Sequence, residues 1–130
     1  MKSEIGDASS AHKMHIGKIG EDVAEKYLRK KGWKILQRNY KARYGEIDIV
    51  AQDDETLVFV EVKTRMGTSF GTPEESVTTR KLREVVETAQ YYKTLHPMLP
   101  EAMRVDVIGI VLDVSHNSVI SLNHVISVTS

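Results

Sequence analysis

Two acids and a lysine occur in the sequence at a spacing that can assemble a site for a divalent cation. Asp48 lies in one apolar stretch, and Glu61 and Lys63 lie two residues apart in the next. Side chains two apart in a strand point to the same face, so Glu46 joins Asp48 on one face. If the polar turn between the stretches forms a β-hairpin, three carboxylates and one ammonium group converge on one patch.

Carboxylates in such apolar surroundings are costly unless they are paired, protonated or bound to metal. Oxygen ligands suit Mg²⁺ or Mn²⁺ rather than zinc. Asp48 and Glu61 can supply carboxylates, and the main-chain carbonyl of Val62 can add a ligand. Such a cation activates water and neutralises charge on a phosphate. Lys63 would orient the nucleophile or stabilise the charge of the transition state.

The simpler alternative for Glu61 and Lys63 is an ion pair on a solvent-facing strand, since exposed strand faces are commonly polar. The residues around them, Leu57 to Val60 and Val62, are all apolar. Such a run is typical of a strand covered on both faces. This context, together with Asp48 one strand earlier, favours a functional site.

Length and composition indicate one ordinary globular domain. The chain has 130 residues and no cysteine, which excludes disulfides, thiolate catalysis and cysteine-bound zinc. No apolar run approaches the roughly 20 residues of a membrane span, and the polar N-terminus does not resemble a signal peptide. We expect a disordered segment over 1–13, a single domain over 14–130, a cytoplasmic location and no association with a membrane.

Charge is unevenly distributed although the formal net charge is zero. Between His12 and Tyr44, ten Lys or Arg residues face three acids, and between Gly45 and Glu55 there are five acids and no base. A basic segment attracts phosphates and an acidic segment can hold a cation, so the pattern fits a metal-dependent enzyme acting on a polyanion. A solvated helix beside an acidic turn explains it equally well.

The hydrophobic pattern predicts a helix over 17–31 that Gly32 ends, and a second helix that Thr78 or Thr79 caps and that runs to about Leu95. Strands are predicted over 33–38, 46–51, 57–63, 104–112 and 119–128. The order is therefore α-β-β-β-α-β-β, an α/β fold with a mixed central sheet flanked by helices. The apolar last strand could be a sheet edge that pairs in a homodimer.

Four ordered motifs carry a family resemblance. They are Gly17-x-x-Gly20-Glu21-x-x-Ala24, Gly45-Glu46-Ile47-Asp48, Phe59-Val60-Glu61-Val62-Lys63-x-Arg65 and Arg104-x-Asp106-Val107. Together they resemble the YraN-like family of small bacterial proteins, a family within the PD-(D/E)xK nuclease superfamily. Members of the YraN-like family are similar to archaeal Holliday junction resolvases. One departure is that Ile47, rather than proline, precedes the first acid. The resemblance implies a restriction-endonuclease-like core.

The resemblance also implies roles for single residues. Asp48 and Glu61 match the metal-binding acids, Lys63 matches the catalytic lysine, and Glu21 matches an acid that resolvase-like members add from the first helix. Without the resemblance, Glu21 is a first-turn acid favoured by the helix dipole. Gln90 lies on the second helix, where nucleases of this class often place a helper residue, and Glu46 is the other helper candidate.

Three hypotheses follow. The first is a Mg²⁺- or Mn²⁺-dependent endonuclease acting on DNA, with branched DNA among the candidate substrates. The second is a nucleic-acid-binding module that keeps the fold but does not cut, and the third is a structural domain with an ion-pair network. The candidate phosphate contacts are Lys18, Arg43, Arg65, Arg80 and Lys81.

Overall fold

The computed structural model describes residues 2–67, 71–113, 115 and 118–128. Its helices are α1 (Lys2–Lys30), the short 3-10 helix η1 (Glu74–Ser76) and α2 (Thr79–Leu95). Its strands are β1 (Lys34–Ala42), β2 (Gly45–Asp53), β3 (Thr56–Met66), β4 (Ala102–Leu112) and β5 (Val119–Val125). The predicted order α-β-β-β-α-β-β is confirmed, with η1 as a short addition before α2.

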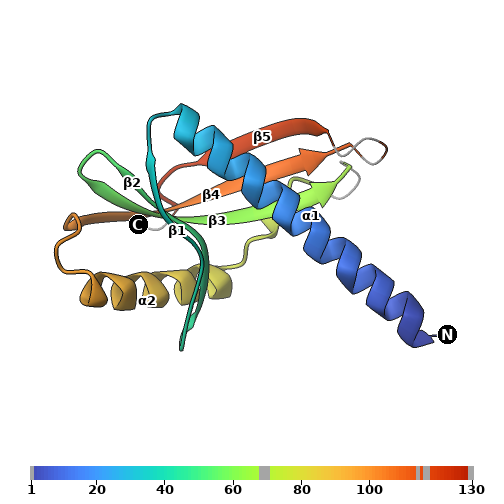
Figure 1. Cartoon of the computed structure of the whole chain (residues 1–130), viewed down its shortest axis with the longest axis horizontal. Coiled ribbons are helices and arrows are strands. Elements are labelled where there is room, and N and C mark those ends of the chain that lie inside the picture. The colour runs from blue at the N-terminus through green and yellow to red at the C-terminus, as the bar shows by residue number, and fades with distance from the viewer. Residues whose placement is uncertain (1, 68–70, 114, 116–117, 129–130) are drawn as a thin grey trace.

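The strands of the described residues form one mixed sheet in the order β1-β2-β3-β4-β5. Strands β1 to β3 are an antiparallel meander, β3 and β4 are parallel, and β5 is antiparallel to β4. A parallel pair needs a crossover connection, and α2 supplies it. In Figure 1, α1 crosses one face of the sheet and α2 lies along the other.

Each helix packs an apolar stripe on its own face of the sheet. Ala24 and Leu28 of α1 belong to a core with Val60, whereas Val85 and Ala89 of α2 belong to a second core. Successive side chains of β3 join the two cores in turn, because strand side chains alternate between faces. The sheet centre is therefore covered on both sides, as the apolar run in β3 predicted.

The N-terminal part of α1 differs from the prediction. The helix begins at Lys2 rather than near Gly17, so it runs through the segment for which we expected disorder. Ile16 is 9% exposed and packs in the core with Ala24 and Leu28, and the first turns of the helix project beyond the sheet (Figure 1). No proline interrupts this segment, and adding turns to an existing helix costs far less than starting one.

Two further predictions concern α2 and β5. The side chain of Thr78 accepts a hydrogen bond from the Lys81 amide at 3.1 Å, which confirms the predicted cap. Strand β5 is a sheet edge with exposed Val119 and Ile120, while the homodimer stays a prediction.

Among the described residues, no helix is long and apolar enough to cross a membrane.

Candidate metal centre

Strands β2 and β3 separate at the two candidate acids. Their pairing runs from Asp53 opposite Thr56 to Ile49 opposite Val60 and ends there. Beyond that point β2 stays paired with β1, and β3 continues beside β4. We call this opening, bounded by Asp48 and Glu61, the fork. The sequence predicted a regular hairpin here, and the separation of the strands is what makes room for two carboxylates.

Asp48 is held in the fork by the main chain of β3. It is 8% exposed, and its Oδ2 accepts a hydrogen bond from the Val62 amide at 2.8 Å. The carboxylate thus satisfies a backbone donor that β2 no longer reaches. We predicted the carbonyl of Val62 as a metal ligand. In the structure, the amide of Val62 donates a hydrogen bond to Asp48, and the role of its carbonyl stays a prediction.

The regular alternation expected for β2 is interrupted beside Asp48. Ile47 packs in the core under α2, whereas Ile49, two residues later, packs in the core under α1. Alternation alone therefore does not fix the face of Asp48, and the shared face of Glu46 and Asp48 stays a prediction. Glu46 is exposed, but its negative charge still acts on Glu61.

Glu61 is the most perturbed acid of the fork. Burial, a hydrogen bond with Asp48 and the charge of Asp48 raise its pKa from 4.5 to about 9, and Lys81 opposes the rise. Its Oε2 atom is buried and has no hydrogen-bond partner among the described residues. The Nζ atom of Lys81 lies 3.7 Å away, beyond hydrogen-bond distance. Without another cation, the raised pKa favours the protonated form of Glu61 at neutral pH.

These features fit a divalent cation. A cation between two carboxylates removes the repulsion that raises the pKa of Glu61, and it gives the unpartnered oxygen a ligand role. Mg²⁺ commonly takes only one or two carboxylates and fills its other positions with water and phosphate. Among the described residues, no three His, Cys, Asp or Glu side chains are already grouped around one point. Asp48 and Glu61, both 8% exposed, are the two carboxylates of the fork that could hold the ion.

Lys63 lies two residues after Glu61 on β3 and is exposed. Alternation puts both side chains on the face of the sheet that α2 covers, next to Phe59 of the α2-side core. Within the described part of the chain, no ion pair or hydrogen bond engages its ammonium group. It therefore differs from the structural ion pair of the alternative interpretation, in which Glu61 and Lys63 would neutralise each other.

Glu21 reaches the fork from α1. Burial and the charge of Asp48 raise its pKa, while hydrogen bonds from Arg38 and Asn39 oppose the rise. The effect of Asp48 means that the structure brings these two acids together, as the resemblance implied. Close packing makes this possible, because a Cβ on Gly20 would overlap the side chain of Thr64 on β3. Gly20 thus lets α1 approach the sheet at the residue before Glu21.

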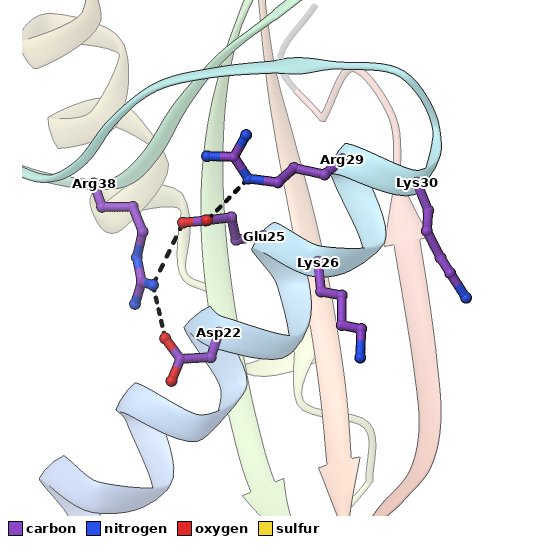
Figure 2. Close-up of a pocket in the computed structure, with 6 residues that line it drawn as sticks. All are labelled: Asp22, Glu25, Lys26, Arg29, Lys30 and Arg38. Atoms are coloured by element: carbon purple, nitrogen blue, oxygen red, sulfur yellow. Dashed lines mark hydrogen bonds and ion pairs between the residues drawn. The ribbon is translucent and has the colours of Figure 1, made fainter.

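Arg38 of β1 holds this part of α1 in place, a role that the sequence did not indicate. Its guanidinium group pairs with Glu21 at 3.2 Å, Asp22 at 2.7 Å and Glu25 at 3.5 Å. Figure 2 shows the group reaching from the strand to the helix between Asp22 and Glu25, with Arg29 on the other side of Glu25. Acids one helical turn apart in the sequence could have signalled a shared partner, but not its position on β1.

The remaining candidates lie at different distances from the fork. Lys81 is beside Glu61, and Lys18 lines a hollow together with Glu21 and Arg38. Gln90 is exposed on α2 beside Phe59 and Arg104. It lies nine residues beyond Lys81, roughly 13 Å along the helix, so the structure does not bring it to the fork.

The other three cations are placed as follows. Arg80 is almost fully exposed, with its side chain 89% accessible, and pairs with Glu84 at 3.7 Å. Arg43 is exposed in the turn between β1 and β2 and stacks over Tyr44. Arg65 is half-buried near the end of β3, and its Nε atom has no hydrogen-bond partner among the described residues.

A second buried polar group lies on the α1 side of the sheet. Asp106 is fully buried and accepts hydrogen bonds from Arg104 at 3.0 Å, His124 at 2.8 Å and the Ser127 amide at 2.9 Å. Burial alone would raise the pKa of Asp106, but these hydrogen bonds outweigh it and the pKa is lowered. Asp106 is thus fully engaged by its neighbours, and this cluster is a satisfied structural network.

Comparison with known proteins identifies the family. The chain is 46% identical over 95 residues to a UPF0102 protein of Persephonella marina, covering 73% of this chain and 82% of the relative. It is 44% identical over 112 residues to one of Syntrophomonas wolfei, covering 86% and 95% respectively. These matches confirm the family resemblance drawn from the motifs. The sequence model of this family also matches residues 20–110, and the chain therefore belongs to the uncharacterised protein family UPF0102.

Proposed function

We propose that the protein is a metal-dependent endonuclease that hydrolyses phosphodiester bonds in DNA, with branched DNA as the substrate form to test first. The observation that carries the proposal is the buried pair of Asp48 and Glu61, in which one oxygen of Glu61 has no hydrogen-bond partner among the described residues. A buried carboxylate pair of this kind is costly as mere structure. It becomes favourable when a cation lies between the two groups.

Each residue of the fork has a proposed role. Asp48 and Glu61 would hold Mg²⁺ or Mn²⁺, and the Val62 amide keeps Asp48 oriented. When bound, the cation supplies charge neutralisation at the scissile phosphate and makes water a better nucleophile. Lys63, exposed on the same strand as Glu61, would orient that nucleophile or stabilise negative charge in the transition state.

DNA is the proposed substrate because its phosphates match the chemistry of the fork and the cations around it. Lys18, Lys63 and Arg80 are exposed on three different elements and can attract a polyanion. A DNA substrate also leads us to propose the cytoplasm as the location of the protein. A non-cutting DNA-binding module is the alternative, since the same cations would serve it.

The test is a cleavage assay on labelled duplex, single-stranded, flap and four-way-junction DNA with Mg²⁺, Mn²⁺ or EDTA. Asp48→Asn is the sharpest variant, because an amide oxygen can still accept from the Val62 amide while the charge is lost. Lys63→Ala is the second. We expect metal-dependent cutting by the wild type and a loss of at least a hundredfold in both variants, the scale of losing one transition-state contact.

Matched controls are Glu55→Gln and Lys34→Ala, an exposed acid and an exposed lysine outside the fork, which should cut like the wild type. Cutting that survives Asp48→Asn would overturn the proposed role of the fork. If no substrate is cut but DNA binds with a strong dependence on salt, the binding module is the better description.

A further inference from the structure

Lys81 is the nearest cation to the unpartnered oxygen of the fork. Its Nζ atom lies 3.7 Å from Glu61 Oε2, and its side chain is 33% exposed. The residue belongs to the first turn of α2, which the Thr78 side chain caps at the Lys81 amide. The backbone of Lys81 is therefore anchored, while its four-carbon stem can move.

The net charge that Lys81 meets in the fork differs between the metal-free and the metal-bound protein. Without a divalent cation, the Asp48–Glu61 pair is protonated on Glu61 but keeps a net negative charge, and the ammonium group of Lys81 is attracted to it. With a divalent cation bound, the two carboxylates and the ion sum to zero, so that attraction is lost. The same ammonium group is also repelled by the ion itself. Lys81 consequently stabilises the metal-free state relative to the metal-bound state.

We propose that Lys81 is the counter-ion of the Asp48–Glu61 pair in the metal-free protein and that a divalent cation displaces its ammonium group, which then binds a phosphate of the DNA. This inference rests on the proposed function. The displaced group stays within reach of the site because its backbone is anchored beside β3, and a lysine ammonium is a common phosphate ligand. Lys81 would thus couple metal loading to substrate binding, a role distinct from that of Lys63.

Calorimetric titration of the full chain with Mn²⁺, without DNA and at one fixed pH, tests the displacement. Lys81→Met removes the charge and keeps most of the stem. We expect its Kd for Mn²⁺ to fall roughly threefold to tenfold, the scale of a partly exposed ion pair. Lys81→Arg keeps the charge and should stay within about twofold of the wild type. Arg80→Met is the matched control, since Arg80 pairs with Glu84 instead, and should also leave the Kd unchanged.

The phosphate contact is tested by DNA binding in a Lys63→Ala background, which keeps both carboxylates and is expected not to cut. Adding Lys81→Met should weaken binding of a labelled four-way junction about threefold to tenfold with Mn²⁺ present. In EDTA, where the Asp48–Glu61 pair attracts the ammonium group of Lys81, the same change should have a smaller effect. An equal effect under both conditions would overturn the coupling.

The outcomes separate this inference from the proposed function. Absence of Mn²⁺ binding by the folded wild type would overturn both. Mn²⁺ binding that is equal or weaker in Lys81→Met would overturn the displacement alone, because a lysine that only positions Glu61 would not oppose the metal. Thermal unfolding of each variant shows whether the fold is intact, and Lys81→Arg provides the comparison if Lys81→Met is unstable.

Discussion

At the scale of single residues, the fork is a balance between burial and charge. Asp48 and Glu61 are each only 8% exposed, so neither is well solvated when ionised. Asp48 gains a hydrogen bond from the Val62 amide, whereas Glu61 Oε2 gains none among the described residues. Burial and the charge of Asp48 raise the pKa of Glu61, which takes the proton when no metal is present.

This balance predicts how stability depends on pH. The pKa of Glu61 is raised to about 9 from 4.5, so between these values the folded protein holds a proton that the unfolded chain has released. The free energy of unfolding should fall as pH rises through this window, by up to about 1.4 kcal/mol per pH unit. Urea unfolding in EDTA between pH 5 and about pH 9 measures the slope.

Glu61→Gln should remove most of that slope and be more stable than the wild type near pH 8, whereas Glu55→Gln should keep it. The raised pKa of Glu21 adds a smaller contribution of the same sign. A wild type and a Glu61→Gln variant with the same slope would show that Glu61 is ionised in the metal-free fold.

The three main site residues could be predicted from sequence because all of them lie on one local hairpin. Apolar neighbours on β3 indicated burial of Glu61, and spacing by two placed Lys63 on its face. Lys81 was predicted only as a phosphate contact, and the three-way pairing of Arg38 was not predicted at all. Both depend on how a helix packs against a strand distant in sequence, which local periodicity does not encode.

At the scale of elements, the approach of α1 to β3 decides whether Glu21 reaches the fork. The contact is tight at Gly20, where an added Cβ would lie 2.9 Å from Thr64 Cβ. Gly17 lies one turn earlier on the same helix, and an added Cβ there meets nothing within 4 Å. The two glycines therefore form a natural pair for measuring what close packing contributes.

Gly20→Ala should destabilise the protein by about 1–3 kcal/mol, the range for overpacking a tight contact. Gly17→Ala should stabilise it by about 0.4–1 kcal/mol, since alanine restricts the unfolded chain and favours the helix. Denaturant unfolding of both variants at one pH gives the comparison. Equal effects of the two substitutions would mean that α1 does not lie against β3 as described.

Element types and order could be predicted because apolar residues recur at clear helical and strand spacings. Two departures have physical causes that such spacings miss. The strands β2 and β3 separate after Ile49 and Val60, where a side chain replaces a main-chain partner. The helix α1 extends to Lys2 although the polar segment before Ile16 has no apolar stripe to predict it.

At the scale of the whole molecule, a chain of zero formal net charge must bind a polyanion through local charge alone. Glu21, Glu46 and the Asp48–Glu61 pair give the fork negative charge, and exposed cations lie on α1, β3 and α2. DNA binding should therefore depend strongly on salt, because each phosphate neutralised releases counter-ions. It should also be stronger when a divalent cation cancels the charge of the fork.

A binding measurement tests this distribution directly. In Glu61→Gln, which is expected not to cut, the logarithm of DNA affinity should fall linearly with that of salt concentration. With four phosphate contacts, raising the salt concentration from 50 to 200 mM would weaken binding about a hundredfold. Adding Lys18→Ala or Lys63→Ala should reduce the slope by roughly one unit each. Lys34→Ala, exposed at the far end of β1 and paired opposite Gln52, should leave it unchanged. A slope that all three substitutions change equally would mean that DNA is held by overall charge rather than across the fork.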